Sequence, residues 1–574
     1  MDEEERRIAY FSMEMAIDPR MPTYSGGLGV LAGDMIRSFA DLGVPAVGVT
    51  LLCNKGYFFQ EIDDKGNQRE EPVEWRTDDM LELVPHKVKV PIGDREVLVQ
   101  PWKYTLKGLN GHEIPILFLD TNVEENLSED REISFYLYGG DRRYRLKQEI
   151  VLGIGGVRVL SALGYGNLDA YHMNEGHTSL LTVELLKRCT GCKIDEEAIE
   201  KMKEKCVFTT HTPVPAGHDI FPKDLVKELL GNYFGDPIID YICENGNGQN
   251  NNLNMTMLAL HFSHYVNGVA RKHAEVSRGL FPEYPIDSIT NGVHHVFWAA
   301  EPFKRVYDKY IQGWKIDPCL LRAVTNVPDE EIKDGHFEAK KKLINRVNKM
   351  ENTGMDYDIF TIGIARRFAK YKRPTLIFSD VERLKEIGRG KLQIVFSGKA
   401  HQRDVEGKKE IKRVLRSADE LGSDVKIAFL ENYDMELAKL IVSGVDLWLN
   451  TPRAPHEASG TSGMKAAING VPSLSSLDGW WLEGHIENIT GWSIGPKPEK
   501  GKEIDDAADA KDMYEKLEKV IMPKFYNEEK SWIKIMKCCI GINGSFFNSH
   551  RMVNQYLVKA YRSTLNQSGE HDFS

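Results

Sequence analysis

One lysine stands in a segment of small residues that could bring its amine against a ligand. The segment Glu457–Lys465 reads EASGTSGMK and follows a predicted strand and a proline-containing loop. Glycines and small side chains let backbone N–H groups approach an anion at the start of a helix. Burial among Met464, Ala466 and Ala467 would lower the pKa of Lys465 and favour Schiff-base chemistry. A glycine-rich turn with a solvated lysine accounts for the same spacing.

A second segment concentrates positive charge in an acidic protein. Arg366–Arg373 reads RRFAKYKR and comes directly after the predicted strand Ile359–Ala365. Ligands bind at the carboxyl ends of strands in open parallel sheets. Arginine and lysine at such an edge suit a phosphate dianion. A solvated, charged helix start would show the same pattern.

Four further segments carry residues that suit a binding loop. Tyr24–Asp34 (YSGGLGVLAGD) resembles a phosphate-cradling turn, but it lacks GxGxxG spacing and no strand clearly precedes it. A plain tight turn is the alternative. His211–His218 (HTPVPAGH) places a histidine before a rigid proline loop, as a site residue or as a structural histidine. Asn174–His177 (NEGH) and Thr290–Val293 (TNGV) could bind sugar hydroxyls or form ordinary surface turns.

The elements that must position these segments alternate in type. Residues 8–298 and 356–549 each show short apolar strands followed by amphipathic helices. In the first stretch we expect a helix at Val30–Leu42 and strands at Ala46–Leu52, Ile114–Leu119 and Val207–Thr210. In the second we expect a helix at Met435–Val442 and strands at Ile359–Ala365, Leu392–Ser397, Lys426–Leu430, Asp446–Asn450 and Pro472–Ser475. Such alternation predicts parallel sheets with helices on both faces, and a site between two such domains.

The intervening and terminal segments complete the expected organisation. We expect domains at residues 1–300 and 356–549, a helical connection at 301–355, and a C-terminal helix and tail at 550–574. Within that last part the helix should run from Arg551 to about Leu565, and Asn566–Ser574 should fray. The Asn/Gly-rich stretch Glu244–Asn254 is typical of a loop.

Composition excludes several classes of protein. The net charge is −11, which argues against nucleic acid or an anionic membrane as a partner. No apolar run is long enough to span a bilayer, and Met1–Arg7 is not followed by a signal-peptide core, so we expect a cytoplasmic protein. Eight cysteines in 574 residues do not form a disulfide scaffold. Cys189 and Cys192 form a CxxC without a second ligand pair, so we expect reduced thiols and no metal site.

Taken together, these segments resemble the glycogen and starch phosphorylase family over most of the chain. EASGTSGMK is similar to the family's pyridoxal-phosphate lysine motif, and RRFAKYKR resembles its phosphate segment. YSGGLGVLAGD, MNEGHT, HTPVPAGH and ITNGV resemble further active-site loops in the expected order.

The resemblance implies roles for individual residues. Lys465 would hold pyridoxal 5'-phosphate in Schiff-base linkage, and the residues near the cofactor would include Gly460, Thr461, Tyr433 and Gly27. The catalytic set would be Lys465, Arg367, Lys372 and His211, with Arg367 and Lys372 binding phosphate groups. The residues contacting the glucosyl unit would be Glu457, Ser459, Gly460, Asn291, Leu28, His211, Asn174 and Glu175.

The resemblance also implies an activity. It predicts a GT-B arrangement of two Rossmann-like domains with the active site in the cleft between them. The reaction would be retaining, reversible phosphorolysis of terminal α-1,4-linked glucose from an α-glucan or maltodextrin by inorganic phosphate, giving glucose 1-phosphate. The cofactor phosphate would act as acid and base, in place of the close carboxylate pair of retaining glycosidases. A homodimer is the family habit. The alternatives are a nucleotide-sugar-dependent, glycogen-synthase-like glucosyltransferase of the same fold and a catalytically silent glucan-binding protein.

Some positions depart from the family pattern. Asp434 follows Tyr433 where long forms have a basic residue, and Asn174–Glu175 replaces an Asn-Asp pair. His211 is followed by TPVPAG instead of a leucine-proline-glutamate run. The glycine-rich loop begins at Tyr24, close to Met1, so we expect a compact short form without long-form allosteric regulation.

Overall fold

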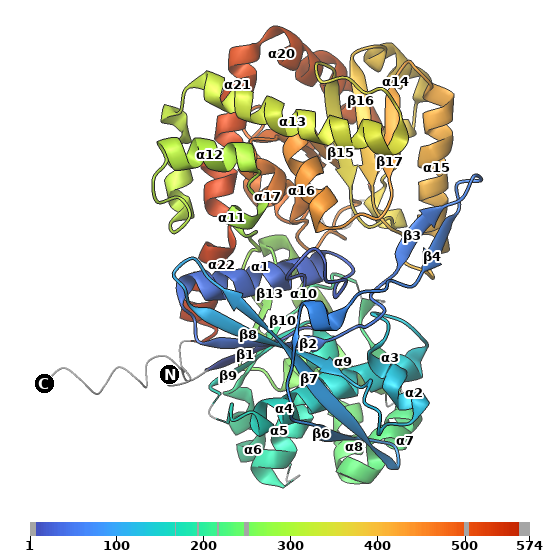
Figure 1. Cartoon of the computed structure of the whole chain (residues 1–574), viewed down its shortest axis with the longest axis vertical. Helices are drawn as coiled ribbons and strands as arrows, with labels where there is room; N and C mark the ends of the chain where they lie inside the picture. The colour runs from blue at the N-terminus through green and yellow to red at the C-terminus, as the bar shows by residue number, and fades with distance from the viewer. Residues whose placement is uncertain are drawn as a thin grey trace, which may run out of the picture.

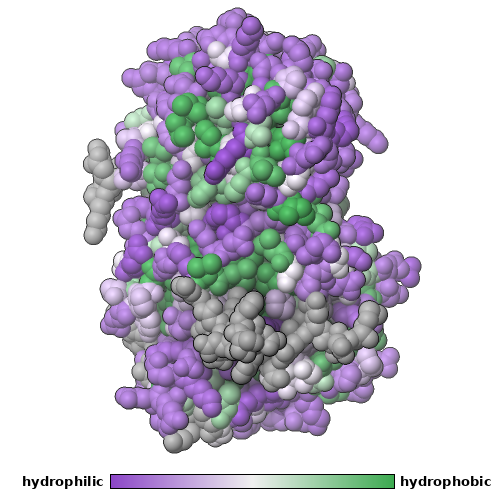
Figure 2. Space-filling model, turned by 90° about the vertical axis from the view of Figure 1, so that its left-hand side faces the viewer, coloured by the Kyte–Doolittle hydropathy of each residue, from purple (hydrophilic) through white to green (hydrophobic). Residues whose placement is uncertain are grey.

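The computed structural model describes residues 7–166, 168–191, 194–214, 217–245, 252–498 and 504–561. In Figure 1 the chain forms two sheet-centred halves, one above the other, with the N-terminal half below. Helices cover both sheets. The described part of the chain holds no helix that is both long and apolar enough to cross a membrane. The surface turned to the viewer in Figure 2 is mainly hydrophilic, with separate apolar patches.

The sheet of the N-terminal half is mixed. Within the described ranges it has ten strands, in the order β14-β13-β10-β9-β1-β2-β8-β7-β5, with β6 on β7. Pairing is parallel from β14 to β8 and antiparallel around β7. The strands are β1 (Ile8–Phe11), β2 (Ala46–Leu51), β5 (Glu82–Leu83), β6 (Val88–Ile92), β7 (Arg95–Lys107), β8 (Glu113–Asp120), β9 (Ala170–Asn174), β10 (Cys206–Thr209), β13 (Tyr265–Gly268) and β14 (Asp287–Ser288).

The sheet of the C-terminal half is parallel throughout its described strands. Its order is β17-β16-β15-β18-β19-β20. The strands are β15 (Phe360–Ala365), β16 (Leu392–Ser397), β17 (Lys426–Leu430), β18 (Leu447–Asn450), β19 (Ser473–Ser476) and β20 (Gly491–Ile494). Every residue of β15 and β16 is buried, which explains why these strands read as unbroken apolar runs.

The helices on these sheets follow the predicted alternation. Those of the N-terminal half include α1 (Gly27–Leu42), α3 (Arg142–Ile150), α4 (Gly156–Ala162), α5 (Leu180–Thr190), α6 (Glu196–Lys203), α7 (Lys223–Phe234), α8 (Asp236–Asn245), α9 (Met255–His261) and α10 (Arg271–Leu280). Those of the C-terminal half include α14 (Val381–Gly388), α15 (Val405–Leu421), α16 (Met435–Gly444), α17 (Ser462–Ile468), α18 (Trp481–Gly484), α19 (Asp506–Lys516), α20 (Met522–Asn527) and α21 (Glu529–Cys538).

The connection between the halves is helical, and its core residues pack in the same hydrophobic cluster as the second sheet. It contains α11 (His295–Trp298), α12 (Glu301–Tyr310), a 3₁₀ segment (Pro318–Asn326) and α13 (Asp329–Glu351). The last helix, α22 (Ser549–Lys559), instead returns to the N-terminal half and lies beside α1 (Figure 1).

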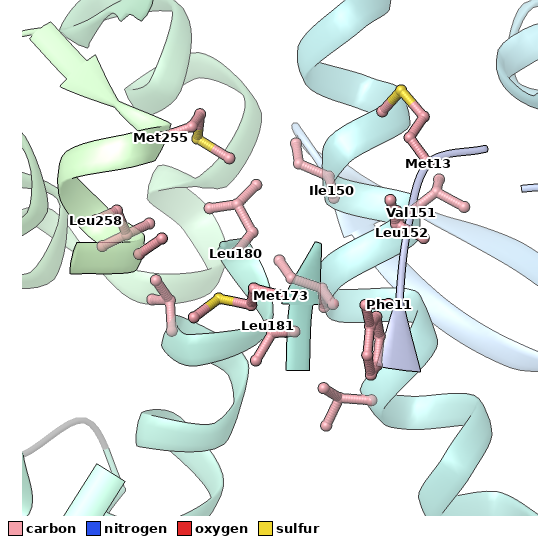
Figure 3. Close-up of a cluster of buried hydrophobic side chains, with 14 of the residues drawn as sticks. Phe11, Met13, Ile150, Val151, Leu152, Met173, Leu180, Leu181, Met255 and Leu258 are labelled. Atoms are coloured by element: carbon pink, nitrogen blue, oxygen red, sulfur yellow. The ribbon is translucent and has the colours of Figure 1, made fainter. Parts of the chain in front are cut away.

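Apolar packing fixes the N-terminal half around its central strands. Figure 3 shows Phe11 and Met13 facing Ile150–Leu152, with Met173 in the same cluster. All of these side chains are fully buried. Truncation of a buried phenylalanine costs about 3–5 kcal/mol, so Phe11 ties β1 firmly to the helices that cover it.

A two-stranded ribbon joins the halves at one edge. β3 (Phe59–Ile62) and β4 (Gln68–Glu71) extend from the N-terminal half toward the C-terminal sheet (Figure 1). The backbone N–H of Gln60 donates to Oδ1 of Asn432 at 2.6 Å, and Nδ2 of Asn432 donates to the Gln60 carbonyl at 2.7 Å. The amine of Lys399 donates to the carbonyl of Phe58 at 2.8 Å.

Several expectations are corrected. The N-terminal sheet is mixed and not wholly parallel, because β7 runs antiparallel to β8. Strand β1 precedes the glycine-rich segment, and α1 starts at Gly27 instead of Val30. Residues 246–251 of the stretch expected as a loop at 244–254 lie outside the described residues, while its first two residues belong to α8 and its last three to β12 (Asn252–Asn254), which pairs with β11 (Ile220–Pro222). The final helix stops at Lys559, and the tail from 562 onward lies outside the described residues, as does Cys192; Cys189 is a free thiol.

Candidate active site

Several predicted site residues lie at the ends of parallel strands or on the loops that follow them, where ligands bind in sheets of this kind. Arg366–Arg373 follows β15, and the loop that carries Glu457 follows β18. Asn174 ends β9, and His211 comes two residues after β10. Pro215 and Ala216 of the HTPVPAGH segment lie outside the described residues.

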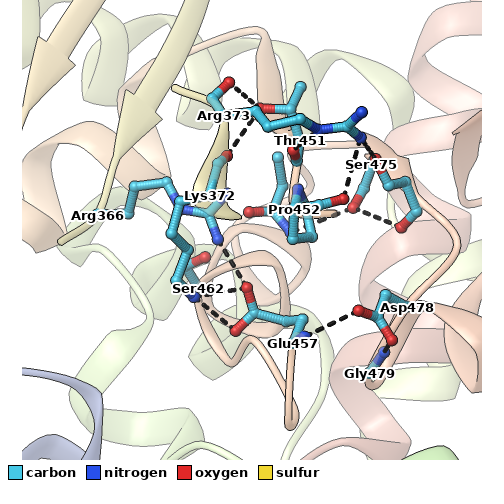
Figure 4. A network of polar contacts seen from close by, with 12 residues as sticks. Arg366, Lys372, Arg373, Thr451, Pro452, Glu457, Ser462, Ser475, Asp478 and Gly479 are labelled. Carbon is cyan, nitrogen blue, oxygen red and sulfur yellow. Dashed lines mark hydrogen bonds and ion pairs between the residues drawn. The ribbon is translucent and has the colours of Figure 1, made fainter. Parts of the chain in front are cut away.

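Glu457 is the centre of a buried ionic cluster. The amine of Lys372 donates to Oε1 and Oε2 of Glu457 at 2.7 and 2.6 Å, and Nη2 of Arg366 donates to Oε2 at 2.7 Å. Figure 4 shows both cations approaching the carboxylate from one side, while Asp478 faces the backbone of Glu457 on the other. Burial opposes ionisation of Glu457, but the charges of Lys372 and Arg366 outweigh it and hold the pKa of Glu457 below its ordinary value.

Arg366 opens the RRFAKYKR segment but was given no role of its own from the sequence. Its Nε and Nη1 atoms are buried and have no hydrogen-bond partner within the described ranges. Unsatisfied guanidinium donors in a buried position are costly, and an anion would satisfy them. Arg367, the predicted phosphate ligand, lies next to Tyr371, whose interaction raises the pKa of Arg367 against the opposing effect of burial.

Asp478 adds a second carboxylate that no motif indicated. Its two oxygens accept the backbone N–H groups of Glu457, at 2.8 Å, and Gly479, at 2.9 Å. Burial, together with the nearby charge of Glu457, raises the pKa of Asp478 to about 7. Its contacts with the backbone fix the loop that carries Glu457.

The loop before α17 approaches Glu457 closely. Gly460 has φ +82°, and a Cβ there would lie 3.2 Å from Cγ of Glu457, so a glycine is needed. The hydroxyl of Ser459 is buried without a hydrogen-bond partner among the residues that the structure describes. Thr461 is the N-cap residue of α17. These three predicted residues therefore lie between Glu457 and Lys465 along a tightly packed turn.

Lys465 lies on α17 and is only 7% exposed. Its Nζ atom lies 4.0 Å from the centre of the Trp298 ring. Burial lowers the pKa of Lys465 to about 8, so a sizeable fraction of the amine is neutral near physiological pH. No hydrogen bond or ion pair joins Lys465 to Arg367 or Lys372 in the described part of the chain.

A third group forms around His211. Its Nε2 donates to Oδ1 of Asn174 at 2.7 Å, and its backbone N–H donates to Oε2 of Glu175 at 2.7 Å. Glu175 has φ +83°, a strained value for a non-glycine residue, and it also accepts the Thr212 hydroxyl at 3.0 Å. Burial lowers the pKa of His211 to about 3, so the ring is neutral. The structure thus brings together three residues that were predicted to contact the glucosyl unit.

Four predicted residues remain. Gly27 and Leu28 open α1, and Tyr433, which burial keeps neutral, lies near Arg366 of the Glu457 cluster. Asn291 is buried, and its Oδ1 finds no hydrogen-bond donor among the described residues. Glu14, which the motifs missed, accepts the N–H groups of Ser25 and Gly26 at 2.5 and 3.2 Å just before α1.

One Asp-His-His group has the composition of a metal site. Potential ligand atoms of Asp41, His294 and His550 lie within 4.8 Å of one another. The Nδ1 atom of His294, however, accepts the N–H of Phe297 at 3.1 Å, so the proton of the neutral ring is on Nε2, which faces Asp41 at 2.8 Å. A histidine that binds a metal through Nε2 carries its proton on Nδ1. The geometry of His294 therefore favours a hydrogen bond to Asp41 over metal binding.

Comparison with known proteins gives a consistent picture. A family model described as carbohydrate phosphorylase matches residues 238–491. Maltodextrin phosphorylase of Thermococcus litoralis is 38% identical across 98% of this chain and 71% of its own length. Glycogen phosphorylase of Aquifex aeolicus is 34% identical across 99% of this chain and 88% of its own. An uncharacterised protein of Methanocaldococcus jannaschii is 33% identical across 96% of this chain and 99% of its own.

Proposed function

The chain belongs to the carbohydrate phosphorylase family, and we propose that it is an α-glucan phosphorylase, an enzyme that transfers a terminal α-1,4-linked glucosyl unit to inorganic phosphate. The product would be glucose 1-phosphate, and the reaction would be reversible and retaining. The observation that carries this proposal is the buried cluster of Arg366, Lys372 and Glu457, with unsatisfied guanidinium donors beside a carboxylate. The similarity to a maltodextrin phosphorylase and a glycogen phosphorylase supports a glucan as the donor.

The residues around Lys465 fit pyridoxal phosphate. A buried amine with a pKa of about 8 and an aromatic ring at 4.0 Å suits covalent capture of an aldehyde. The Ser459 hydroxyl, which has no hydrogen-bond partner among the described residues, offers a hydrogen bond to a polar ligand. We propose that Lys465 holds the cofactor, with Gly460, Thr461 and Tyr433 beside it and Gly27 at the start of α1. When bound, the cofactor supplies a phosphate group that can exchange protons with inorganic phosphate.

The chain's own residues would then bind and orient the reactants. Arg366, Arg367 and Lys372 hold phosphate by charge and hydrogen bonding, which offsets the repulsion between two phosphate groups. Ordering both reactants in one site removes much of the entropic barrier to their encounter. Burial of the cluster excludes water, so phosphate and not water accepts the glucosyl unit.

Other side chains would select the sugar. The carboxylate of Glu457, the hydroxyl of Ser459 and the amide of Asn291 are suited to glucosyl hydroxyls, as are His211 and the Asn174–Glu175 pair that holds it. Leu28 would line the same site. Asp478 does not complete a glycosidase-type carboxylate pair with Glu457, because two backbone N–H groups already engage its oxygens.

The site would lie between the two halves, and the enzyme would act as a homodimer.

The proposal is tested by incubating the purified chain with maltodextrin and inorganic phosphate and measuring glucose 1-phosphate, alongside the near-ultraviolet spectrum. We expect phosphate-dependent release of glucose 1-phosphate and a pyridoxal absorbance. A nucleotide-sugar glucosyltransferase of the same fold would instead consume a nucleoside diphosphate glucose and show no such absorbance. A silent glucan-binding protein would bind maltodextrin without turnover.

A further inference from the structure

Three elements far apart in the chain meet around the amine of Lys465. Lys465 lies on α17, Trp298 ends α11, and Asp34 lies on α1. The ring of Trp298 covers the amine at 4.0 Å, and its Nε1 donates to Oδ2 of Asp34 at 2.8 Å. Trp298 is 1% exposed and Asp34 is completely buried. The carboxylate of Asp34 therefore fixes the aromatic face against which the amine lies.

The charges around this site oppose one another. Asp34 favours the ammonium form of Lys465, and Arg37 favours the neutral amine. Nη1 of Arg37 lies 3.3 Å from Oδ1 of Asp34, and its Nη2 donates to the carbonyls of Ala16 and Ile17. The guanidinium also lies over the Phe297 ring, and the half-buried amine of Lys439 approaches that ring at 3.7 Å. Asp34 pairs with Arg37 and favours the ammonium form of Lys465. Asp18 and Asp41 also favour the charged form of Arg37, and Glu436 favours the ammonium form of Lys439.

A carboxylate at position 34 is not needed to hold the indole. An amide oxygen would accept the same Nε1–H without a buried charge and without the arginine that accompanies it. Burial of an ion pair is costly and commonly contributes no net stability. The backbone next to Asp34 is tightly packed, because a Cβ on Gly33 would lie 2.0 Å from the carbonyl oxygen of Ala16. The charge at Asp34 therefore calls for a role other than support of Trp298.

We propose that Asp34 is a positioning residue for Lys465, which clamps the Trp298 ring over the amine and, balanced by Arg37, sets the fraction of the amine that is free to capture an aldehyde. This inference rests on the proposed function, because the aldehyde it concerns is that of pyridoxal phosphate. The charge balance matters most when the cofactor is loaded, since only the neutral amine is a nucleophile.

The test measures the reactivity of Lys465 in the full-length chain freed of cofactor. Formaldehyde with cyanoborohydride labels neutral amines, and peptide mass spectrometry reports the extent at Lys465 and at exposed Lys409 as a function of pH. Asp34→Asn keeps an acceptor for the indole and removes the charge. Arg37→Gln removes the opposing charge. Asp18→Asn, at a partly exposed acid near the same arginine, is the matched control.

In the wild-type chain we expect the labelling midpoint of Lys465 to lie well below that of Lys409. Asp34→Asn should move it further down and raise labelling of Lys465 at neutral pH about five-fold for a one-unit fall in pKa. Arg37→Gln should move it up, and Asp18→Asn should leave it unchanged. Circular dichroism checks that each variant is folded. If one variant does not fold, the labelling midpoint of the other variant and the comparison of Lys465 with Lys409 in the wild type still test the inference.

Loading with pyridoxal phosphate, followed by borohydride reduction, distinguishes failure of the role of Asp34 from failure of the proposed function. An adduct at Lys465 whose pH midpoint falls in Asp34→Asn and rises in Arg37→Gln supports both the role of Asp34 and the proposed function. An adduct at Lys465 with the same midpoint in Asp34→Asn, Arg37→Gln and wild type overturns the role of Asp34 and leaves the proposed function standing. Absence of any Lys465 adduct, despite shifted formaldehyde labelling, overturns the proposed function. Equal formaldehyde midpoints for Lys465 and Lys409 overturn the inference outright.

Discussion

The amine of Lys372 and the carboxylate of Glu457 form a two-pronged ion pair, with Nζ 2.7 and 2.6 Å from the two carboxylate oxygens. In the proposed reaction these residues serve different reactants, phosphate for Lys372 and sugar for Glu457. Without ligands they neutralise each other. Binding of phosphate must therefore draw Lys372 partly away from Glu457, which couples the occupation of the two subsites.

Replacement of Glu457 by Gln should expose this coupling. The substitution leaves Arg366 and Lys372 without their buried counter-charge, and loss of one partner of a buried pair costs about 3–5 kcal/mol. The variant should unfold more easily in the absence of ligands, and inorganic phosphate should restore more of its stability than it adds to the wild type. Activity should fall about 100-fold, as expected for loss of a preorganised charge in the site.

Thermal unfolding with and without phosphate measures the first effect, and initial rates of glucose 1-phosphate release measure the second. Glu406→Gln is the control, because Glu406 pairs with Lys409 on the surface. A variant that phosphate stabilises no more than the wild type would show that the two subsites are independent.

Replacement of Lys465 by Ala should abolish both the pyridoxal absorbance and phosphorolysis, because it removes the amine that is proposed to bind the aldehyde. The spectrum of the purified variant and its rate of glucose 1-phosphate formation are the measurements. Lys409→Ala, at an exposed position, should keep both. Full phosphorolysis by Lys465→Ala without bound cofactor would contradict the proposed role of this lysine.

Acid should destabilise the fold through buried histidines. Burial lowers the pKa values of His172, His177 and His211 from 6.5 to about 3. Since each ring is neutral in the folded state, its contribution is complete above pH 6.5 and is lost as the pH falls from 6.5 toward 3. Each ring should remove about 1.4 kcal/mol per pH unit in that window.

Urea unfolding of the wild type and of His172→Gln across this pH range tests the effect. His172 contacts Thr209 at 2.9 Å and also Tyr561, so the variant loses these contacts at every pH. The pH-dependent part of the difference isolates the titration of the ring. Parallel stability curves for the two proteins would rule out a contribution from His172.

The stability that Asp478 contributes should change with pH in the opposite direction to that of the buried histidines. Its pKa rises from 3.8 to about 7 on folding, so the folded chain binds more protons than the unfolded chain between these values. Stability contributed by Asp478 therefore falls as the pH rises from about 4 to about 7, by about 1.4 kcal/mol per unit. The free energy of unfolding of wild type minus that of Asp478→Asn should decline over this window and then level off. Exposed Asp78→Asn should give a flat difference.

The sequence predicted five of the six described strands of the C-terminal sheet, because these strands are largely buried and mostly form apolar runs, but it did not predict β20 (Gly491–Ile494). Leu392–Ser397 and Lys426–Leu430 have the predicted bounds, and Ile359–Ala365 loses one residue at its start. The N-terminal sheet was harder to predict. β7 alternates half-exposed and buried residues in a long antiparallel strand, and β9 buries His172 and Asn174, so neither reads as an apolar run.

Site residues that lie in short motifs could be predicted from the sequence, whereas contacts between distant residues could not. Glu457, Lys372, His211 and Lys465 lie in short motifs, so their residue types and spacing were visible in the sequence. The pairing of Asp34 with Trp298 joins residues 264 positions apart, and nothing local to either one indicates the other. Asp478 likewise acts through backbone contacts that only the folded loop creates.

The return of α22 to the N-terminal half has a consequence for synthesis. Met552, Val553 and Tyr556 of α22 pack in one cluster with Met35 and Ile36 of α1. Residues of the first half leave the ribosome long before this helix is made. The apolar patch that α22 covers therefore remains exposed while the second half is translated. The first half can reach its final packing only after α22 has been translated.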